Sequence, residues 1–233
     1  MPEPTPDLSV HLQTLPLFPL QLVLYPDGVL PLRIFEVRYL DLIGRAHREG
    51  KPFGVVSLIE GRDTQQPAAA PGSAAYADEH FHDIGTLATI THLERPQPGL
   101  MVIRCVGTQR FRLASRQRLK HGLWTGSASL LEADAPIPVP PDLAAASDTL
   151  RALLAQLQLD ADAGEAPAFH RPYRWTDCGW VANRWCELLP LPALMKQQLL
   201  QTDSPLLRLE LVADVLDQVR RRGGLGGPAP GAA

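Results

Sequence analysis

The sequence has few cysteines, few aromatic residues and no long apolar run. Its three cysteines, Cys105, Cys178 and Cys186, have neither the spacing of a disulfide framework nor that of a metal-binding motif. No segment approaches the roughly 20 consecutive apolar residues of a membrane-spanning helix. Residues 1–14 lack the basic start and apolar run of a signal peptide. These absences predict a soluble cytoplasmic protein.

An excess of charge of one sign is also lacking. The 22 basic and 25 acidic residues give a net charge of −3, which exerts no overall attraction on nucleic acid or an anionic membrane. A phosphate-binding loop is missing as well, because five residues separate Gly44 from Gly50 and Pro52 stands where that loop needs Ser or Thr. The sequence therefore predicts no cofactor.

Proline is abundant, and residues 15–36 show its effect most clearly. They read LPLFPLQLVLYPDGVLPLRIFE. This stretch has too many prolines for a helix and too many apolar residues for a surface loop, so we expect buried extended chain. Pro26-Asp27-Gly28 predicts a turn between two hairpin arms, residues 21–25 and 29–34. Pro31 cannot donate to a ladder and therefore belongs at an edge or bulge.

The same stretch, with Arg38-Tyr39 after it, closely resembles the opening of the substrate-binding domain at the amino end of the ATP-dependent protease Lon. Further similar segments follow in order at Gly54–Val56, Ile84–Ala88, Val106–Arg112 and Leu188–Leu191. In that family an ATPase ring and a Ser-Lys proteolytic domain follow this module. Because the chain ends before either could begin, the resemblance implies a non-catalytic, ATP-independent module for peptide binding in protein quality control.

The pattern of elements predicts an α+β fold. Short stretches that alternate apolar and polar residues precede a half with helical spacing. We expect a mixed β-barrel subdomain over residues 9–133, with one early helix from residue 36 to 47, and a helical bundle over residues 142–222. The resemblance implies that the barrel is PUA-like. Residues 1–8 and 223–233 are predicted to be disordered tails.

Local signals place several element boundaries. Gly50 follows the early helix, and Ser204-Pro205 combines an N-cap with a proline at the first helical position. Residues 100–106 and 110–113 are predicted to form two separate strands.

Aromatic residues are the candidates for peptide binding. They are Trp180, Trp185, Tyr173 and Phe35. Trp180 and Trp185 lie about 140° apart around a helix, so they cannot face the same way. Most of the aromatic side chains are expected to belong to the core, and the alternative is that one of these two tryptophans is partly exposed and binds an apolar polypeptide segment. We predict the binding surface in a groove between barrel and helices, with polypeptide substrates or a separate protease as partner.

Four residues are predicted to form a structural corner where the hairpin enters the helix. They are Arg33, Glu36, Arg38 and Tyr39. Charged side chains in so apolar a setting are expected to pair or to bond backbone carbonyls. Two arginines and one glutamate make a poor general acid–base pair, which argues against catalysis here.

Two other functions are weighed against peptide binding. The positions of Arg110, Arg112 and Arg118 differ by even numbers, so on one continuous strand they would lie on the same face and could form a basic surface for RNA. Few aromatic residues accompany them, which argues against RNA binding. A small-molecule-binding or hydrolytic site between the two subdomains is the second alternative. His80 and His82 could meet on one side of a strand, but without a third ligand of defined spacing they predict no metal site.

Overall fold

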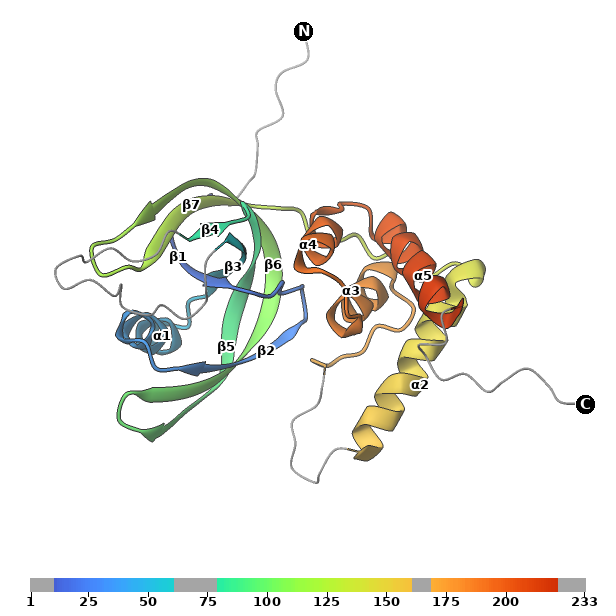
Figure 1. The fold of residues 1–233 in the computed structure, drawn as a ribbon, viewed down its shortest axis with the longest axis horizontal. Coiled ribbons are helices and arrows are strands. Elements are labelled where there is room, and N and C mark those ends of the chain that lie inside the picture. The colour runs from blue at the N-terminus through green and yellow to red at the C-terminus, as the bar shows by residue number, and fades with distance from the viewer. Residues whose placement is uncertain (1–10, 61–78, 161–168, 222–233) are drawn as a thin grey trace, which may run out of the picture. The chain divides into compact units, whose positions relative to one another are not determined.

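The computed structural model describes residues 11–60, 79–160 and 169–221. In these residues seven strands and five α-helices form a mixed α+β structure, which confirms the predicted fold class (Figure 1). The predicted tails, residues 1–8 and 223–233, lie outside the described part.

The chain divides into two compact units. The first, called the strand-rich unit here, comprises the chain up to Ala133 together with Leu191–Gln201. The second, called the helical unit, comprises Asp134–Pro190 and the chain from Thr202 onward.

The strand-rich unit contains all seven strands and two helices. They are β1 (His11–Leu20), β2 (Val29–Ile34), α1 (Val37–Glu49), β3 (Phe53–Glu60), β4 (His80–Phe81), β5 (Ile84–Gln97), β6 (Leu100–Arg118), β7 (Trp124–Leu130) and α4 (Ala193–Gln201). The strands pair in the order β1-β7-β6-β5-β3-β4, and β2 pairs with β6 beside that path. β1 also pairs with β3 in parallel, whereas the other strand pairs are antiparallel.

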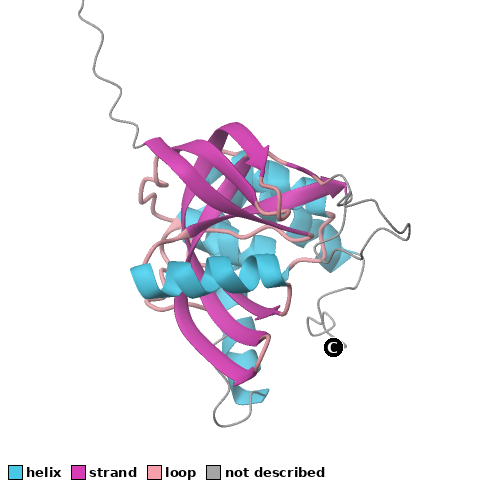
Figure 2. Ribbon diagram, turned by 90° about the vertical axis from the view of Figure 1, so that its left-hand side faces the viewer, coloured by secondary structure: helices cyan, strands magenta, loops and turns pink. Residues whose placement is uncertain are grey.

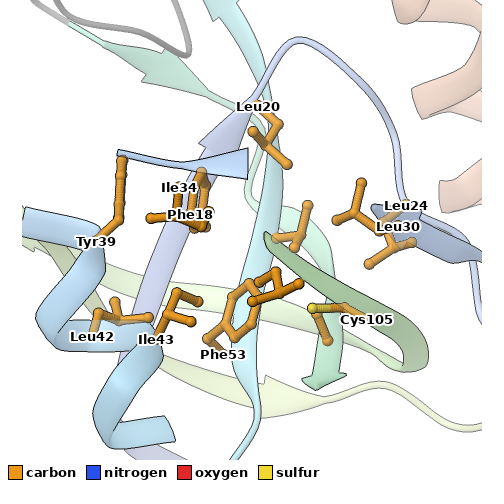
Figure 3. Close-up of a cluster of buried hydrophobic side chains, with 13 residues drawn as sticks. Phe18, Leu20, Leu24, Leu30, Ile34, Tyr39, Leu42, Ile43, Phe53 and Cys105 are labelled. Atoms are coloured by element: carbon orange, nitrogen blue, oxygen red, sulfur yellow. The ribbon is translucent and has the colours of Figure 1, made fainter. Parts of the chain in front are cut away.

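β1 supplies side chains to two hydrophobic clusters. Leu15 and Leu17 pack in a cluster with Phe111. Phe18 and Leu20 pack in a second cluster, which Figure 3 shows. Successive side chains of a strand point to opposite faces, so a nearly continuous apolar run can fill cores on both of its sides. Burial of these apolar side chains therefore outweighs the loss of the two backbone N–H donors that the prolines of this strand lack.

The hairpin predicted around the Pro26-Asp27-Gly28 turn is wrong. The turn forms, with the Gly28 N–H donating to the Tyr25 carbonyl at 2.9 Å, but residues 21–25 form no strand. β2 instead pairs with β6, Val29 lying opposite Val106. Residues 24 and 25 pack against β5 and β6, where the Thr86 hydroxyl donates to the Leu24 carbonyl at 2.6 Å.

The two strands predicted over residues 100–106 and 110–113 are one long strand, β6. Gly107 continues the pairing, because its N–H donates to the Gly28 carbonyl at 2.9 Å. A Cβ atom at residue 107 would lie 2.2 Å from the Tyr25 carbonyl oxygen, so this close approach requires glycine.

α1 begins and ends close to its predicted bounds and lies alongside the strands (Figure 2). Gly50 ends it in the left-handed region at φ 62°. Tyr39, Leu42 and Ile43 belong to the second cluster, where Figure 3 shows Ile43 beside Phe53.

α4 is fastened to the rest of the strand-rich unit by side-chain bonds to backbone carbonyls. The Tyr25 hydroxyl donates to the Lys196 carbonyl at 2.6 Å, and Arg110 donates to the Leu200 carbonyl at 2.8 Å. In the reverse direction, the Gln197 amide donates to the Ile84 carbonyl at 2.8 Å.

The helical unit is built around α3. Its elements are the short 3₁₀ helix η1 (Pro141–Leu143), α2 (Ala144–Asp160), α3 (Cys178–Leu188) and α5 (Pro205–Arg221). α3 is buried from Cys178 to Cys186. The Ser204 hydroxyl caps α5 by accepting the Leu207 N–H at 3.2 Å, as the sequence predicts. None of the described helices is long and apolar enough to cross a membrane.

Buried Arg208 joins several parts of this unit. It pairs with Asp134 at 2.5 Å and donates to Asn183 of α3 at 3.0 Å. A further bond reaches the Thr202 carbonyl. This arginine links the start of the unit to α3 and α5.

Candidate functional site

A cleft opens where β2 leads into α1. It has a volume of about 110 Å³ and is lined by Leu32–Glu36, by Phe18 and Leu20 of β1, and by Tyr39 of α1. An engineered cavity of about 150 Å³ binds benzene, so this cleft has room for one apolar side chain.

The inner wall of the cleft is apolar and preformed. The rings of Phe18 and Tyr39 stack with their centroids 3.9 Å apart and their planes at 13°. Ile34 lies beside Phe18, and both side chains are buried (Figure 3). Because these residues come from β1, β2 and α1, three elements of one hydrophobic core hold the wall in place.

The rim carries large apolar side chains in solvent. Phe35 is 58% exposed, and Val37 is 76% exposed. Phe35 lies just after β2, which ends at the buried Ile34, and Val37 is the first residue of α1. Exposed apolar residues next to an apolar cleft are typical of a binding surface.

Arg38 fixes the corner beneath this rim. It pairs with Glu36 at 2.9 Å, approaches Glu79 at 3.4 Å and donates to the Gly122 carbonyl at 2.8 Å. Its guanidinium also lies 4.4 Å from the centroid of the Tyr39 ring. The structure thus brings together Glu36, Arg38 and Tyr39, whereas Arg33 stays exposed on the cleft wall.

The electrostatics keep Arg38 charged. Burial alone lowers its pKa, but electrostatic interactions with Tyr39, Glu36 and Glu79 and the hydrogen bond to Glu36 outweigh burial and raise the pKa above its ordinary value. Glu79 also accepts the Trp124 indole N–H at 2.5 Å. These groups are engaged in structure, which leaves none of them placed as a general base.

Trp180 and Trp185 both lie in the core, so the alternative of one partly exposed tryptophan is wrong. They are 2% and 1% exposed, because α3 is surrounded by other elements of its unit. Trp185 donates to the Ala146 carbonyl at 2.9 Å. Tyr173 is partly exposed and packs near Trp180, with ring centroids 6.0 Å apart. Among the four predicted peptide-binding residues, only Phe35 lies in the strand-rich unit.

The predicted basic strand face does not form as one surface. Arg110 is 4% exposed and points to α4, so its assignment to a nucleic-acid face is wrong. Arg112 is exposed, whereas Arg118 lies 5.5 Å from the centroid of the Trp124 ring. The register of β6 with β7 shifts between Leu113 and Ser115, so the regular alternation of faces that the prediction assumed does not continue from Arg112 to Arg118.

Ionisable groups away from the cleft also occur in the described part of the chain. Within the described residues, no group of three or more His, Cys, Asp or Glu side chains gathers to hold a metal. Burial raises the pKa of Cys105 to about 12, which keeps it an unreactive thiol at neutral pH. Burial also lowers the pKa of His82.

Comparison with known families identifies the module. A family model for the substrate-binding domain of ATP-dependent protease La (LON) matches residues 14–218, a span that includes every residue lining the cleft. The chain belongs to this family. The resemblance predicted from the sequence is therefore confirmed. The family is one of substrate-binding domains, which supports a substrate-binding role for this member.

Solved structures agree with the family assignment. A Lon N-terminal domain protein from Xanthomonas campestris is 30% identical, with a TM-score of 0.61, over 87% of this chain and 98% of that one. The N-terminal domain of Mycobacterium avium complex Lon protease is 19% identical, with a TM-score of 0.53, over 87% and 97%, which shows the fold alone. A comparison with curated proteins gave no match.

Sequence reasoning missed several residues of this cleft. Phe18, Leu20 and Leu32 line it. These residues had no signal of their own, since their apolar character fits a core position equally well.

Proposed function

We propose that this Lon substrate-binding domain is a non-catalytic module that binds exposed apolar segments of polypeptides through the Phe35 cleft. The observation that carries the proposal is an apolar cleft whose rim holds a largely exposed phenylalanine. The family supplies the partner class, which is polypeptide substrate or a separate protease. Segments of this kind are exposed in proteins destined for proteolysis.

Burial of apolar surface supports this assignment energetically. Full burial of a phenylalanine side chain is worth about 1.5–3 kcal/mol. More than half of the Phe35 surface is still in solvent, so a bound apolar segment gains about 1–1.5 kcal/mol by covering it. That free energy corresponds to about a tenfold change in affinity.

We also infer that the strand-rich unit is a closed PUA-like barrel and that the helical unit is a bundle. β1 pairs with both β7 and β3, so the path β1-β7-β6-β5-β3 returns to β1. In the helical unit, α3 contacts both α2 and α5. These pairings support the predicted subdomains over residues 9–133 and 142–222, with α4 attached to the first.

A binding assay with a matched control tests the proposed function. The probes are a reduced, carboxymethylated protein that stays unfolded and a short fluorescein-labelled peptide of alternating leucine and threonine. Phe35→Ala is expected to weaken both about tenfold. Ile59→Ala is the control, because Ile59 is 59% exposed in the same unit but does not line the cleft.

Two results would contradict the proposal. One is equal affinity of Phe35→Ala and Ile59→Ala for the unfolded probes. The other is tighter binding of single-stranded RNA than of either polypeptide probe, which would restore the RNA alternative in spite of the buried Arg110.

A further inference from the structure

We propose that the outer edge of β2 takes up an extended polypeptide as an additional strand, with one apolar side chain of that strand in the cleft. This inference rests on the proposed function. It specifies the conformation of the bound segment and the size of its anchor. The occupant is thus an unfolded stretch of another protein in extended form.

The hydrogen bonds at Gly107 show which backbone groups of β2 are used by β6. Gly107 donates to the Gly28 carbonyl at 2.9 Å and accepts the Asp27 N–H at 2.8 Å, so it occupies a hydrogen-bonded position. Such positions alternate with non-bonded ones along an antiparallel pair. The register from Val29/Val106 to Ile34/Met101 is uninterrupted.

Counting along this register divides β2 into two sets. Leu30, Leu32 and Ile34 turn their backbone groups to β6. Val29, Pro31 and Arg33 turn theirs to the opposite edge. Pro31 agrees with this count, because a residue without an N–H loses no ladder bond where the N–H would point outward.

The outer edge of β2 is open to pairing. In the described part of the chain, β2 pairs with no strand except β6. Pro31 and Arg33 are exposed, and Val29 is partly exposed. The edge therefore offers two N–H groups and three carbonyls to a partner, and an unpaired row of this kind is a template for strand addition.

The cleft lies along the same strand. β2 and the chain after it contribute Leu32–Glu36, and the facing wall comes from Phe18 and Leu20 of β1, a strand that does not pair with β2. In an added strand every second side chain points to the same face. The cleft volume of about 110 Å³ admits one of them. The arrangement fits an extended segment with a single apolar anchor such as leucine.

The gap at Pro31 fits a transient partner. A proline in the middle of an edge strand hinders long, uninterrupted pairing between copies of a protein. The donors at Val29 and Arg33 remain on either side of it for a short segment. The edge is thus suited to brief capture of unfolded chain rather than to a permanent sheet.

A backbone methylation series on the unmodified protein tests strand addition directly. The leucine–threonine peptide is made with a single N-methyl group at each position in turn. Strand addition predicts a period of two. Methylation where the peptide N–H faces β2 weakens binding about fivefold, and methylation at the alternate positions has less than about a twofold effect. A uniform effect, or none at any position, would overturn the inference.

A pair of variants tests the same edge from the protein side. Arg33→Pro removes the outward N–H and leaves the β6 ladder intact, whereas Arg33→Ala removes the charge and retains the N–H. Arg33→Pro is expected to bind the peptide about fivefold more weakly than Arg33→Ala. Equal affinity of the two variants, with matching thermal unfolding midpoints, would refute the edge contact. If Arg33→Pro does not fold, the methylation series decides alone.

The outcomes separate this inference from the proposed function. Binding that depends on Phe35 but shows no methylation period leaves the cleft assignment standing and refutes strand addition. Absence of any binding refutes both. A concentration-dependent dimer that Phe35→Ala leaves intact and Arg33→Pro dissociates would assign the edge to a second copy of this chain instead.

Discussion

At the scale of single residues, Arg38 shows how the corner beneath the cleft is held. Its side chain is buried with Glu79 and bonded to Glu36 and the Gly122 carbonyl. Arg38→Met would leave carboxylates without their cation, which costs about 3–5 kcal/mol for buried pairs. Urea unfolding should show this loss. The matched control is Arg45→Met, at an exposed position of the same helix, with an expected change below about 0.5 kcal/mol. Equal urea midpoints for the two variants would contradict this account of the corner.

Cys105 gives stability a dependence on alkaline pH. Its folded-state pKa is raised from 9.0 to about 12 by burial. A raised pKa contributes stability that is fully present below pH 9 and is lost as the pH rises toward 12. Above about pH 9.5, the free energy of unfolding should fall more steeply with pH than it does in the Cys105→Ala variant. The difference in slope should be about 1.4 kcal/mol per pH unit. Parallel curves for the two proteins would show that the thiol is not shielded.

At the scale of elements, local signals and tertiary contacts decided different features. Gly50 and Ser204-Pro205 mark their helix ends correctly, because a cap acts within one turn. The partner of β2 depended on distant residues. Residues 21–25 are apolar enough for a strand, yet Leu24 and Tyr25 pack on Gly107, which only the folded chain brings near. Strand pairing is set by such contacts, and the sequence alone does not reveal them.

The attachment of α4 is a testable feature at this scale. Arg110 donates its charged hydrogen bond to the last turn of α4, at the Leu200 carbonyl. Arg110→Ala removes a bond worth about 1.5–3 kcal/mol. Amide exchange over Ala193–Gln201 should then accelerate more than in the rest of the sheet. Arg112→Ala, at an exposed neighbouring position, is the control and should leave these rates unchanged. Equal exchange in both variants would contradict the proposed fastening.

At the scale of the whole molecule, the family could be identified from the sequence, because similar segments follow in the same order along most of the chain. The site could be predicted only in part. Phe35 was predicted and lies on the cleft. The alternative of a partly exposed Trp180 or Trp185 came from the helical angle between them, which was considered without the neighbours of α3. Periodicity gives the direction of a side chain relative to its own helix. Whether that direction leads to solvent depends on the packing of other elements.

Salt dependence distinguishes apolar recognition from electrostatic recognition across the molecule. A net charge of −3 and an apolar cleft predict that peptide affinity changes by less than about twofold between roughly 50 and 500 mM salt. Fluorescence anisotropy with the labelled peptide measures this dependence. A steep loss of affinity with salt would indicate that charged groups dominate the interaction.

Photocrosslinking from residue 35 tests the central claim most directly. A photoreactive amino acid replaces Phe35 in one protein and Ile59 in another, and each is irradiated with the unfolded carboxymethylated probe. The two positions are equally exposed, at 58% and 59%, so solvent access does not distinguish them. The account predicts strong crosslinking from position 35, competed by the unlabelled peptide, and weak crosslinking from position 59. Equal yields from the two positions, or a yield at position 35 that the peptide does not reduce, would contradict it.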